Sequence, residues 1–154
     1  NHPLKILGRF DIDDKVINKE IIFYNKILGD FNWTYIRNLG EFHSYTLMDK
    51  NLILISADST LGFEALARNK KIIMFPFRHI KISDPFGWPS KFDDVGVFWS
   101  DINSKEIFFK IVSDALNSDI NSWKKSIKPY KDQIMLFDQN NNIFNNKLKK
   151  IFNY

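Results

Sequence analysis

Short apolar runs alternate with longer amphipathic segments along this chain, and that alternation limits its fold more than any other feature. Five of the runs are rich in β-branched or aromatic residues, as buried strands are. They read PLKIL (3–7), WTYI (33–36), LILIS (52–56), KIIMF (71–75) and VGVFW (95–99). Strands connected through helices pair in parallel and cross over with a right hand. The sequence therefore predicts an α/β fold, a Rossmann-like doubly wound parallel sheet of about five strands with helices on both faces and extra C-terminal helices.

Two amphipathic segments carry signals for the ends of helices. The first, DKVINKEIIFYNKILG (14–29), begins among acidic residues that suit a helix N-terminus, and Gly29 is a good C-cap. The second, NSKEIFFKIVSDALN (103–117), offers Asn103 as N-cap with Glu106 three residues later. Both segments place apolar residues at helical spacing, so we expect each to cover one face of the sheet.

The chain of 154 residues is long enough for one well-packed core. We predict a Rossmann-like domain over residues 1–118 and a helical extension over residues 119–154 that packs on it. The extension carries helical segments that Pro129 and the asparagine-rich run DQNNNIFNN (138–146) are expected to interrupt.

Composition excludes several classes of site. The chain has no cysteine, so disulfides and thiolate metal sites are ruled out, and its three histidines are not spaced as a metal site. No run approaches the roughly 18 apolar residues of a membrane span. The net charge of +4 is small and spread out, so it selects no partner by itself. We expect a cytoplasmic protein without a transmembrane segment, cofactor, metal or nucleic-acid partner, and a place at the inner face of the membrane stays open.

The most informative stretch is SADSTLGFEALARNKKIIMF (56–75), which joins two of the predicted strands through a helix. In a parallel sheet, ligands bind beyond the carboxyl ends of the strands. There Ser59 and Thr60 can cap the helix, whose first N–H groups form an anion site. Gly62 in the first turn costs roughly 1 kcal/mol relative to alanine. Either a phosphate approaches the backbone closely at that point, or the glycine packs tightly against a strand.

Glu64 has two interpretations as well. It precedes Arg68 by four residues, a spacing that favours a solvated ion pair on the helix surface. Alternatively, its carboxylate stands one turn into the helix, where it can accept hydrogen bonds from ribose hydroxyls while the helix N-terminus holds phosphates.

The segment SADSTLGFEALARNKKIIMFP (56–76) resembles the nucleotide-sugar-binding segment of GT-B glycosyltransferases. Its STLGxEA motif is similar to the signature of bacterial surface-carbohydrate biosynthesis transferases. The resemblance is strong over residues 50–77 and extends more weakly to the N-terminus through LKILGR and KEIIFYNKILG. It implies phosphate contacts from Ser59, Thr60 and Gly62, and a ribose contact from Glu64. It also implies that Arg9, after the first strand, is a cation on the phosphate side.

GT-B enzymes have two Rossmann-like halves, and this chain has room for one. It resembles the C-terminal, donor-binding half, so residues 1–118 are expected to be the nucleotide-sugar-binding domain and the N-terminal half of the same protein becomes an expected partner. Because that half usually supplies the catalytic base, no catalytic residue is assigned. The D-x-D within DIDD (11–14) is better explained by its place before a helix, where acids belong. His2-Pro3 is a weak match to a sialyltransferase element, since no strand precedes it.

A long segment, PFRHIKISDPFGWPSKFDDVG (76–96), follows the fourth predicted strand. Loops of this length are often functional. Arg78 and His79 stand at the predicted ligand edge, so they are candidates for sugar or phosphate contact, with an ordinary surface loop as the alternative.

Together these observations predict the nucleotide-sugar donor-binding half of a glycosyltransferase in bacterial surface polysaccharide biosynthesis. Its partners would be a nucleotide-activated sugar and a glycan or lipid-linked acceptor, and the isolated chain is expected to be inactive. A GT-B-like sugar-nucleotide epimerase is one alternative, although it would place more glycines after the serine. A non-catalytic nucleotide-binding or receiver-like module, with Asp58 as a strand-end acid, is another.

Overall fold

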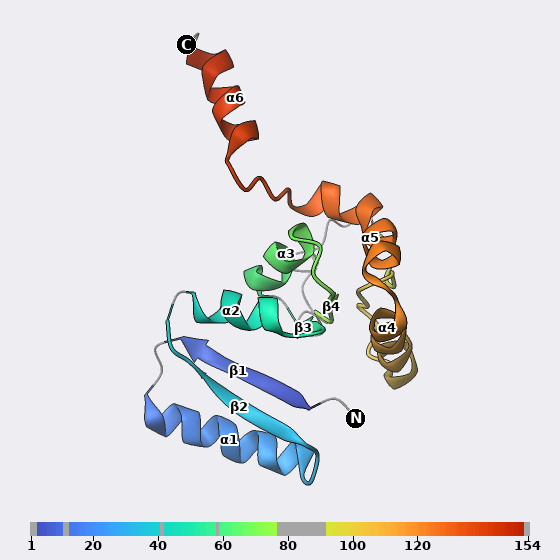
Figure 1. Cartoon of the computed structure of the whole chain (residues 1–154). Helices are drawn as coiled ribbons and strands as arrows, with labels where there is room; N and C mark the ends of the chain where they lie inside the picture. Colours follow the sequence, from blue (N-terminus) through green and yellow to red (C-terminus); the bar gives the residue numbers. More distant parts are fainter. Residues whose placement is uncertain (1–2, 11–12, 41, 58, 77–91, 153–154) are drawn as a thin grey trace. The chain divides into compact units, whose positions relative to one another are not determined.

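The computed structural model describes residues 3–10, 13–40, 42–57, 59–76 and 92–152. Within these residues the protein is α/β, with six helices and short parallel strands in two small sheets (Figure 1). The chain divides into two compact units, Asn1–Lys50 and Asn51–Tyr154, which are called the first and second unit below. The α/β class and the parallel pairing predicted from the sequence are confirmed. The division at residue 118 stays a prediction.

The first unit is a strand–helix–strand motif followed by a helix. Strand β1 (Leu4–Phe10) pairs in parallel with β2 (Trp33–Asn38), with Leu4 opposite Trp33, and α1 (Asp14–Leu28) connects them. Helix α2 (His43–Lys50) follows. The sequence did not indicate α2, because its eight residues lack a clear apolar period.

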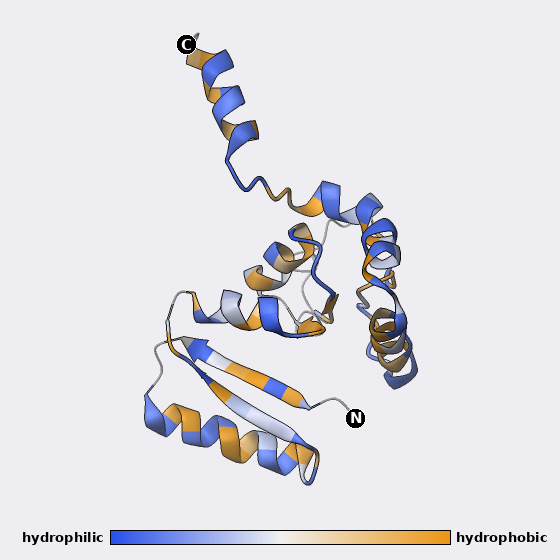
Figure 2. Cartoon of the chain, viewed as in Figure 1, coloured by the Kyte–Doolittle hydropathy of each residue, from blue (hydrophilic) through white to orange (hydrophobic). Residues whose placement is uncertain are grey.

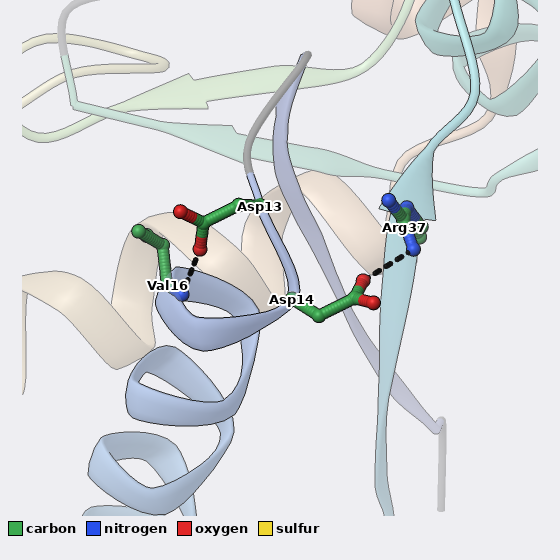
Figure 3. Close-up of polar contacts among 4 residues, drawn as sticks. All are labelled: Asp13, Asp14, Val16 and Arg37. Atoms are coloured by element: carbon green, nitrogen blue, oxygen red, sulfur yellow. Dashed lines mark hydrogen bonds and ion pairs between the residues drawn. The ribbon is translucent and has the colours of Figure 1, made fainter.

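Helix α1 has the ends that its sequence predicted. The Asp13 carboxylate caps it by accepting a hydrogen bond from the Val16 N–H at 2.9 Å. Gly29 ends it at φ 52°, in the left-handed region, and the Gly29 N–H donates to the Asn25 carbonyl at 3.0 Å. Asp14 forms an ion pair with Arg37 of β2 at 2.7 Å (Figure 3). The acids of this segment therefore serve the start of the helix and its attachment to the sheet.

Gly8 of β1 leaves room for a tyrosine that crosses it. A Cβ at Gly8 would lie 2.0 Å from the Tyr35 hydroxyl oxygen, which is far too close for any side chain. Lying over the glycine, Tyr35 donates a hydrogen bond from its hydroxyl to the Glu20 carboxylate of α1 at 2.6 Å. Burial, and next the hydrogen bond and the charge of Glu20, raise the pKa of Tyr35 to about 12. This contact and the Asp14–Arg37 pair both connect α1 to β2.

The second unit repeats the strand–helix–strand motif. Strand β3 (Leu54–Ser56) pairs in parallel with β4 (Ile72–Met74), and α3 (Thr60–Ala67) connects them. Figure 2 colours α3 mostly as apolar, in agreement with the burial of five of its eight residues. Since the ends of β3 and β4 lie at the same edge of this sheet, the loop into α3 begins at the carboxyl edge.

The fifth predicted strand is wrong in extent. Around residues 95–100, the structure has only two isolated bridges, a parallel one between Met74 and Trp99 and an antiparallel one between Val95 and Ser100. The chain forms a tight hairpin here, in which the Gly96 N–H donates to the Trp99 carbonyl at 3.0 Å. One bridge joins Trp99 to β4, and the other lies within the hairpin itself. Among the described residues, the sheets are thus two-stranded, and a five-stranded doubly wound sheet is not shown.

Three helices complete the second unit, namely α4 (Lys105–Asn117), α5 (Ile120–Ile134) and α6 (Asn142–Phe152). The predicted N-cap of α4, Asn103, is wrong by one residue. Ser104 caps the helix instead, and its hydroxyl oxygen accepts from the Ile107 N–H at 3.3 Å while donating to Glu106. Both residue types are good caps, and the side chain that reaches the third N–H decides between them.

The expected interruption at Pro129 is also wrong, because α5 continues through it. A proline inside a helix removes one hydrogen bond and costs about 3 kcal/mol. Aromatic side chains on both sides of Pro129 hold α5 against the unit. Trp123 is buried and donates from its indole Nε1 to the Lys70 carbonyl at 3.0 Å, and Tyr130 stacks edge-on against Trp99 with ring centroids 4.8 Å apart.

Candidate functional site

The candidate site is the loop and first turn that follow β3. The Ser56 hydroxyl at the end of this strand accepts a hydrogen bond from the Ser59 N–H at 3.2 Å. Ser59 then caps α3, since its hydroxyl oxygen accepts from the Leu61 N–H at 3.3 Å and its carbonyl from the Gly62 N–H at 2.9 Å. The loop is therefore held at the carboxyl edge of the sheet by its own serines, and Ser59 and Thr60 are exposed there.

Gly62 is buried, and the space beside its Cα is filled by the two strands. A Cβ at this position would meet the Cβ and hydroxyl oxygen of Ser56, both at 3.2 Å, and the terminal methyl of Met74 at 3.3 Å. Distances this short are tighter than ordinary contact, so the glycine lets α3 approach β3 and β4 closely. Tight packing against a strand, one of the two roles expected for Gly62, accounts for the residue. A phosphate contact from its backbone stays a prediction.

Glu64 lies one turn into α3 and is half-buried. The backbone N–H of Arg68 donates to the Glu64 carbonyl at 3.0 Å as the helix ends. The guanidinium of Arg68 lies over the ring of Phe137, 4.7 Å from its centroid. A cation over an aromatic face is favourable, so Arg68 has a role in packing near the end of α5.

The structure brings together only part of the predicted set. Ser59, Thr60, Gly62 and Glu64 lie within six residues at the start of α3. Arg9 is exposed in the first unit, and it lies within β1 rather than after it. Arg78 and His79 lie outside the described residues.

A carboxylate that the sequence analysis did not single out lies close to this sheet. The segment before Asp101 lies alongside β4. The Met74 N–H donates to the Phe98 carbonyl at 2.8 Å, and the Ser100 N–H donates to the Met74 carbonyl at 3.1 Å. Asp101 therefore comes directly after a chain segment that runs parallel to β4. Asp101 is the second residue after the fifth apolar run (95–99), so inspection of the two residues that follow this run would have found it.

The surroundings of the Asp101 carboxylate disfavour its charged form. One of its oxygens, Oδ1, is buried and has no hydrogen-bond partner among the described residues. Burial raises the pKa of Asp101, and the nearby charge of Asp94 raises it further. Perturbed carboxylates of this kind gather at functional sites, so Asp101 joins the candidate residues.

The part of the chain that the structure describes holds neither a metal cluster nor a membrane-spanning helix. No cluster of three or more histidine, cysteine, aspartate or glutamate side chains that could bind a metal ion occurs there. None of the described helices is long and apolar enough to cross a membrane.

One family model matches almost the whole chain, over residues 2–152, and its description reads "putative O-antigen biosynthesis protein". The match includes both units and the candidate site. No curated protein and no solved structure matches the chain.

Proposed function

Because the chain belongs to this family of O-antigen biosynthesis proteins, we propose that it is the nucleotide-sugar donor-binding half of a glycosyltransferase that builds bacterial surface polysaccharide. The family description names the process and leaves the reaction open. The observation that carries the proposal is the β3–α3–β4 motif, whose capped helix starts at the carboxyl edge of a parallel strand pair.

In this proposal the diphosphate binds at the start of α3. Helix N-termini attract anions through their N–H groups and the helix dipole. The exposed hydroxyls of Ser59 and Thr60 stand at this end of α3 and would contact the phosphate oxygens. Gly62 supports the site by allowing the helix to lie close to the strands, as a glycine does in the dinucleotide-binding motif.

The ribose would bind one turn further along, where the Glu64 carboxylate can accept hydrogen bonds from its hydroxyls. Arg9, Arg78 and His79 are proposed as phosphate or sugar contacts. Sugar transfer would then rely on stabilising the departing phosphate with N–H groups and cations, without covalent chemistry in this half. The catalytic base and the acceptor site would come from the other half of the protein.

The experiment that tests the proposal is calorimetry of the 154-residue chain with UDP, GDP and CMP, without added metal. We expect weak binding, because half of the cleft is supplied elsewhere. Glu64→Gln should weaken that binding by roughly 1–3 kcal/mol, the cost of losing a charged hydrogen-bond acceptor.

The matched control is Glu106→Gln, which removes a carboxylate from the first turn of α4 and should leave nucleotide binding unchanged. If no nucleotide binds at millimolar concentration, the donor-binding role is wrong. If both variants bind as the parent does, Glu64 does not hold the ribose.

A further inference from the structure

Helix α6 has a defined start, but its side chains do not pack into a hydrophobic core. The Asp138 carboxylate accepts a hydrogen bond from the Ile143 N–H at 2.5 Å, and the Asn141 carbonyl accepts from the Asn145 N–H at 2.8 Å. Asn141 has a φ of 53°, which turns the chain into the helix. None of the described side chains of α6 is buried. An isolated helix of 11 residues is marginal in water, so a covering surface would stabilise it.

One face of α6 is apolar. Phe144, Leu148 and Ile151 follow one another at spacings of four and three residues, which places them on one side of the helix. Phe144 is 61% exposed and Ile151 is 70% exposed. In Figure 2, apolar and polar residues alternate along α6 as expected for a two-faced helix.

The charged residues of α6 are all basic. Three lysines, Lys147, Lys149 and Lys150, lie within its 11 residues, and the helix contains no aspartate or glutamate. Its other polar residues are asparagines. A helix with a basic polar face and an apolar face of phenylalanine, leucine and isoleucine suits the boundary between lipid headgroups and acyl chains.

Helix α1 shows why charge, and not apolar exposure alone, identifies the partner. It also exposes large apolar side chains, among them Phe23 and Ile27. Its sequence mixes three lysines with Asp14 and Glu20, however, so it has little preference for an anionic surface. Only α6 combines exposed apolar residues with charge of a single sign among the helices described here.

We propose that α6 is an interfacial anchor that lies in the plane of an anionic lipid bilayer. The stripe of Phe144, Leu148 and Ile151 would enter the acyl boundary, and the lysines would face the phosphates of anionic headgroups. This inference concerns a surface remote in sequence from the α3 site and does not rest on the proposed donor-binding function.

The test uses the 154-residue chain and sedimentation with vesicles, either phosphatidylcholine alone or phosphatidylcholine mixed with phosphatidylglycerol. We expect binding to the mixed vesicles that falls as salt rises, since salt screens surface charge. Replacing Lys147, Lys149 and Lys150 by glutamine should lower the partition coefficient about 5-fold for each lysine. The matched control replaces three exposed lysines of α5, Lys124, Lys125 and Lys128, and should lose far less.

A second pair of variants tests the apolar face. Phe144→Ser with Ile151→Ser should reduce vesicle binding at least 10-fold, whereas Phe23→Ser with Ile27→Ser on α1 should change it little. The melting temperature of the α6 variants should stay that of the parent, because these side chains are not buried.

Three results would overturn the proposal. They are no binding to mixed vesicles at low salt, equal binding to both vesicle types, and equal losses in the test and control variants. A dimer seen by sedimentation velocity without vesicles, and dissociated by the α6 serine variants, would assign the face to a second copy of the chain instead.

Discussion

The first unit connects its helix to its strands mainly by polar contacts, and α1 buries Ile17 alone, whereas the second unit relies on burial. In the first, the hydrogen bond from Tyr35 to Glu20 and the ion pair between Arg37 and Asp14 join β2 to α1. In the second, α3 buries five of its eight residues. The two motifs have the same order of elements and the same parallel pairing.

The same topology is therefore stabilised by different forces in the two units. Burial of apolar area contributes roughly 25 cal/mol per Å², whereas an exposed ion pair contributes at most about 1 kcal/mol. We therefore expect truncation of a buried α3 side chain to cost more than truncation of an apolar side chain on the largely exposed α1. The second unit should be the more stable of the two, and its α3 segment carries the candidate site.

The largest effect is expected for Leu66→Ala in α3. Leu66 is fully buried, so the substitution should leave a cavity and lower the free energy of unfolding by about 2–5 kcal/mol. Ile27→Ala on α1 is the comparison, because Ile27 is 60% exposed and its loss should cost under about 0.5 kcal/mol. Urea denaturation measures both values. Similar losses would contradict the contrast between the units.

A medium effect is expected for Gly8→Ala in the first unit. The new methyl must displace the Tyr35 ring and with it the hydrogen bond to Glu20, so we expect a loss of about 1–3 kcal/mol. The displaced ring should also titrate differently. Its pKa should fall from about 12 toward the usual value near 10, which an ultraviolet absorbance titration would detect.

Gly62→Ala is the counterpart of Gly8→Ala in the second unit. Alanine gains about 1 kcal/mol in helix propensity but must move the flexible Met74 methyl and the stiffer Ser56 side chain by a few tenths of an ångström. We expect stability to change by less than about 1 kcal/mol and nucleotide binding to weaken. A variant that is more stable and binds as well as the parent would show that Gly62 is not there for a ligand.

The smallest effect is expected for Asp101→Asn, which should stabilise the folded protein at pH 7. Because the folded protein raises the pKa of Asp101, this carboxyl favours folding only when protonated, and its contribution is lost as pH rises through the raised pKa. Removing the charge should therefore raise stability at pH 7 by less than about 0.5 kcal/mol, because the Asp101 side chain is only partly buried. At a pH below the usual aspartate pKa, parent and variant should agree. A lower stability of the variant at pH 7 would refute the interpretation.

Local signals in the sequence predicted the ends of α1 and the approximate places of the first four strands. Caps act over three or four residues, so Asp13 and Gly29 are readable from their neighbours alone. The continuation of α5 through Pro129 could not be predicted from near neighbours. Its cost is offset by Trp123 and Tyr130, whose partners Lys70 and Trp99 lie far from them along the chain.

The prediction of a fifth strand failed for a related reason. Its residues have the composition of a strand, yet the indole of Trp99 covers Gly96 so closely that a Cβ there would lie 2.0 Å from the ring. Apolar composition does not reveal such a turn, because composition is the same in an extended strand and in a hairpin. Asp101 was missed with it, since its burial depends on where that hairpin places it.

Local patterns in the sequence predicted the α/β class and the parallel pairing of the strands, and they singled out the segment from Ser59 to Glu64, whose role as a site stays a prediction. These features follow from periodicity and from caps, which are interactions between near neighbours. Three other features depend on tertiary contacts. Gly62 packs against Ser56 and Met74, Tyr35 crosses Gly8, and an Asp101 oxygen is buried without a partner among the described residues. Each of these depends on which distant atoms fill the space around a residue, and packing of that kind is specified only when the strands have paired.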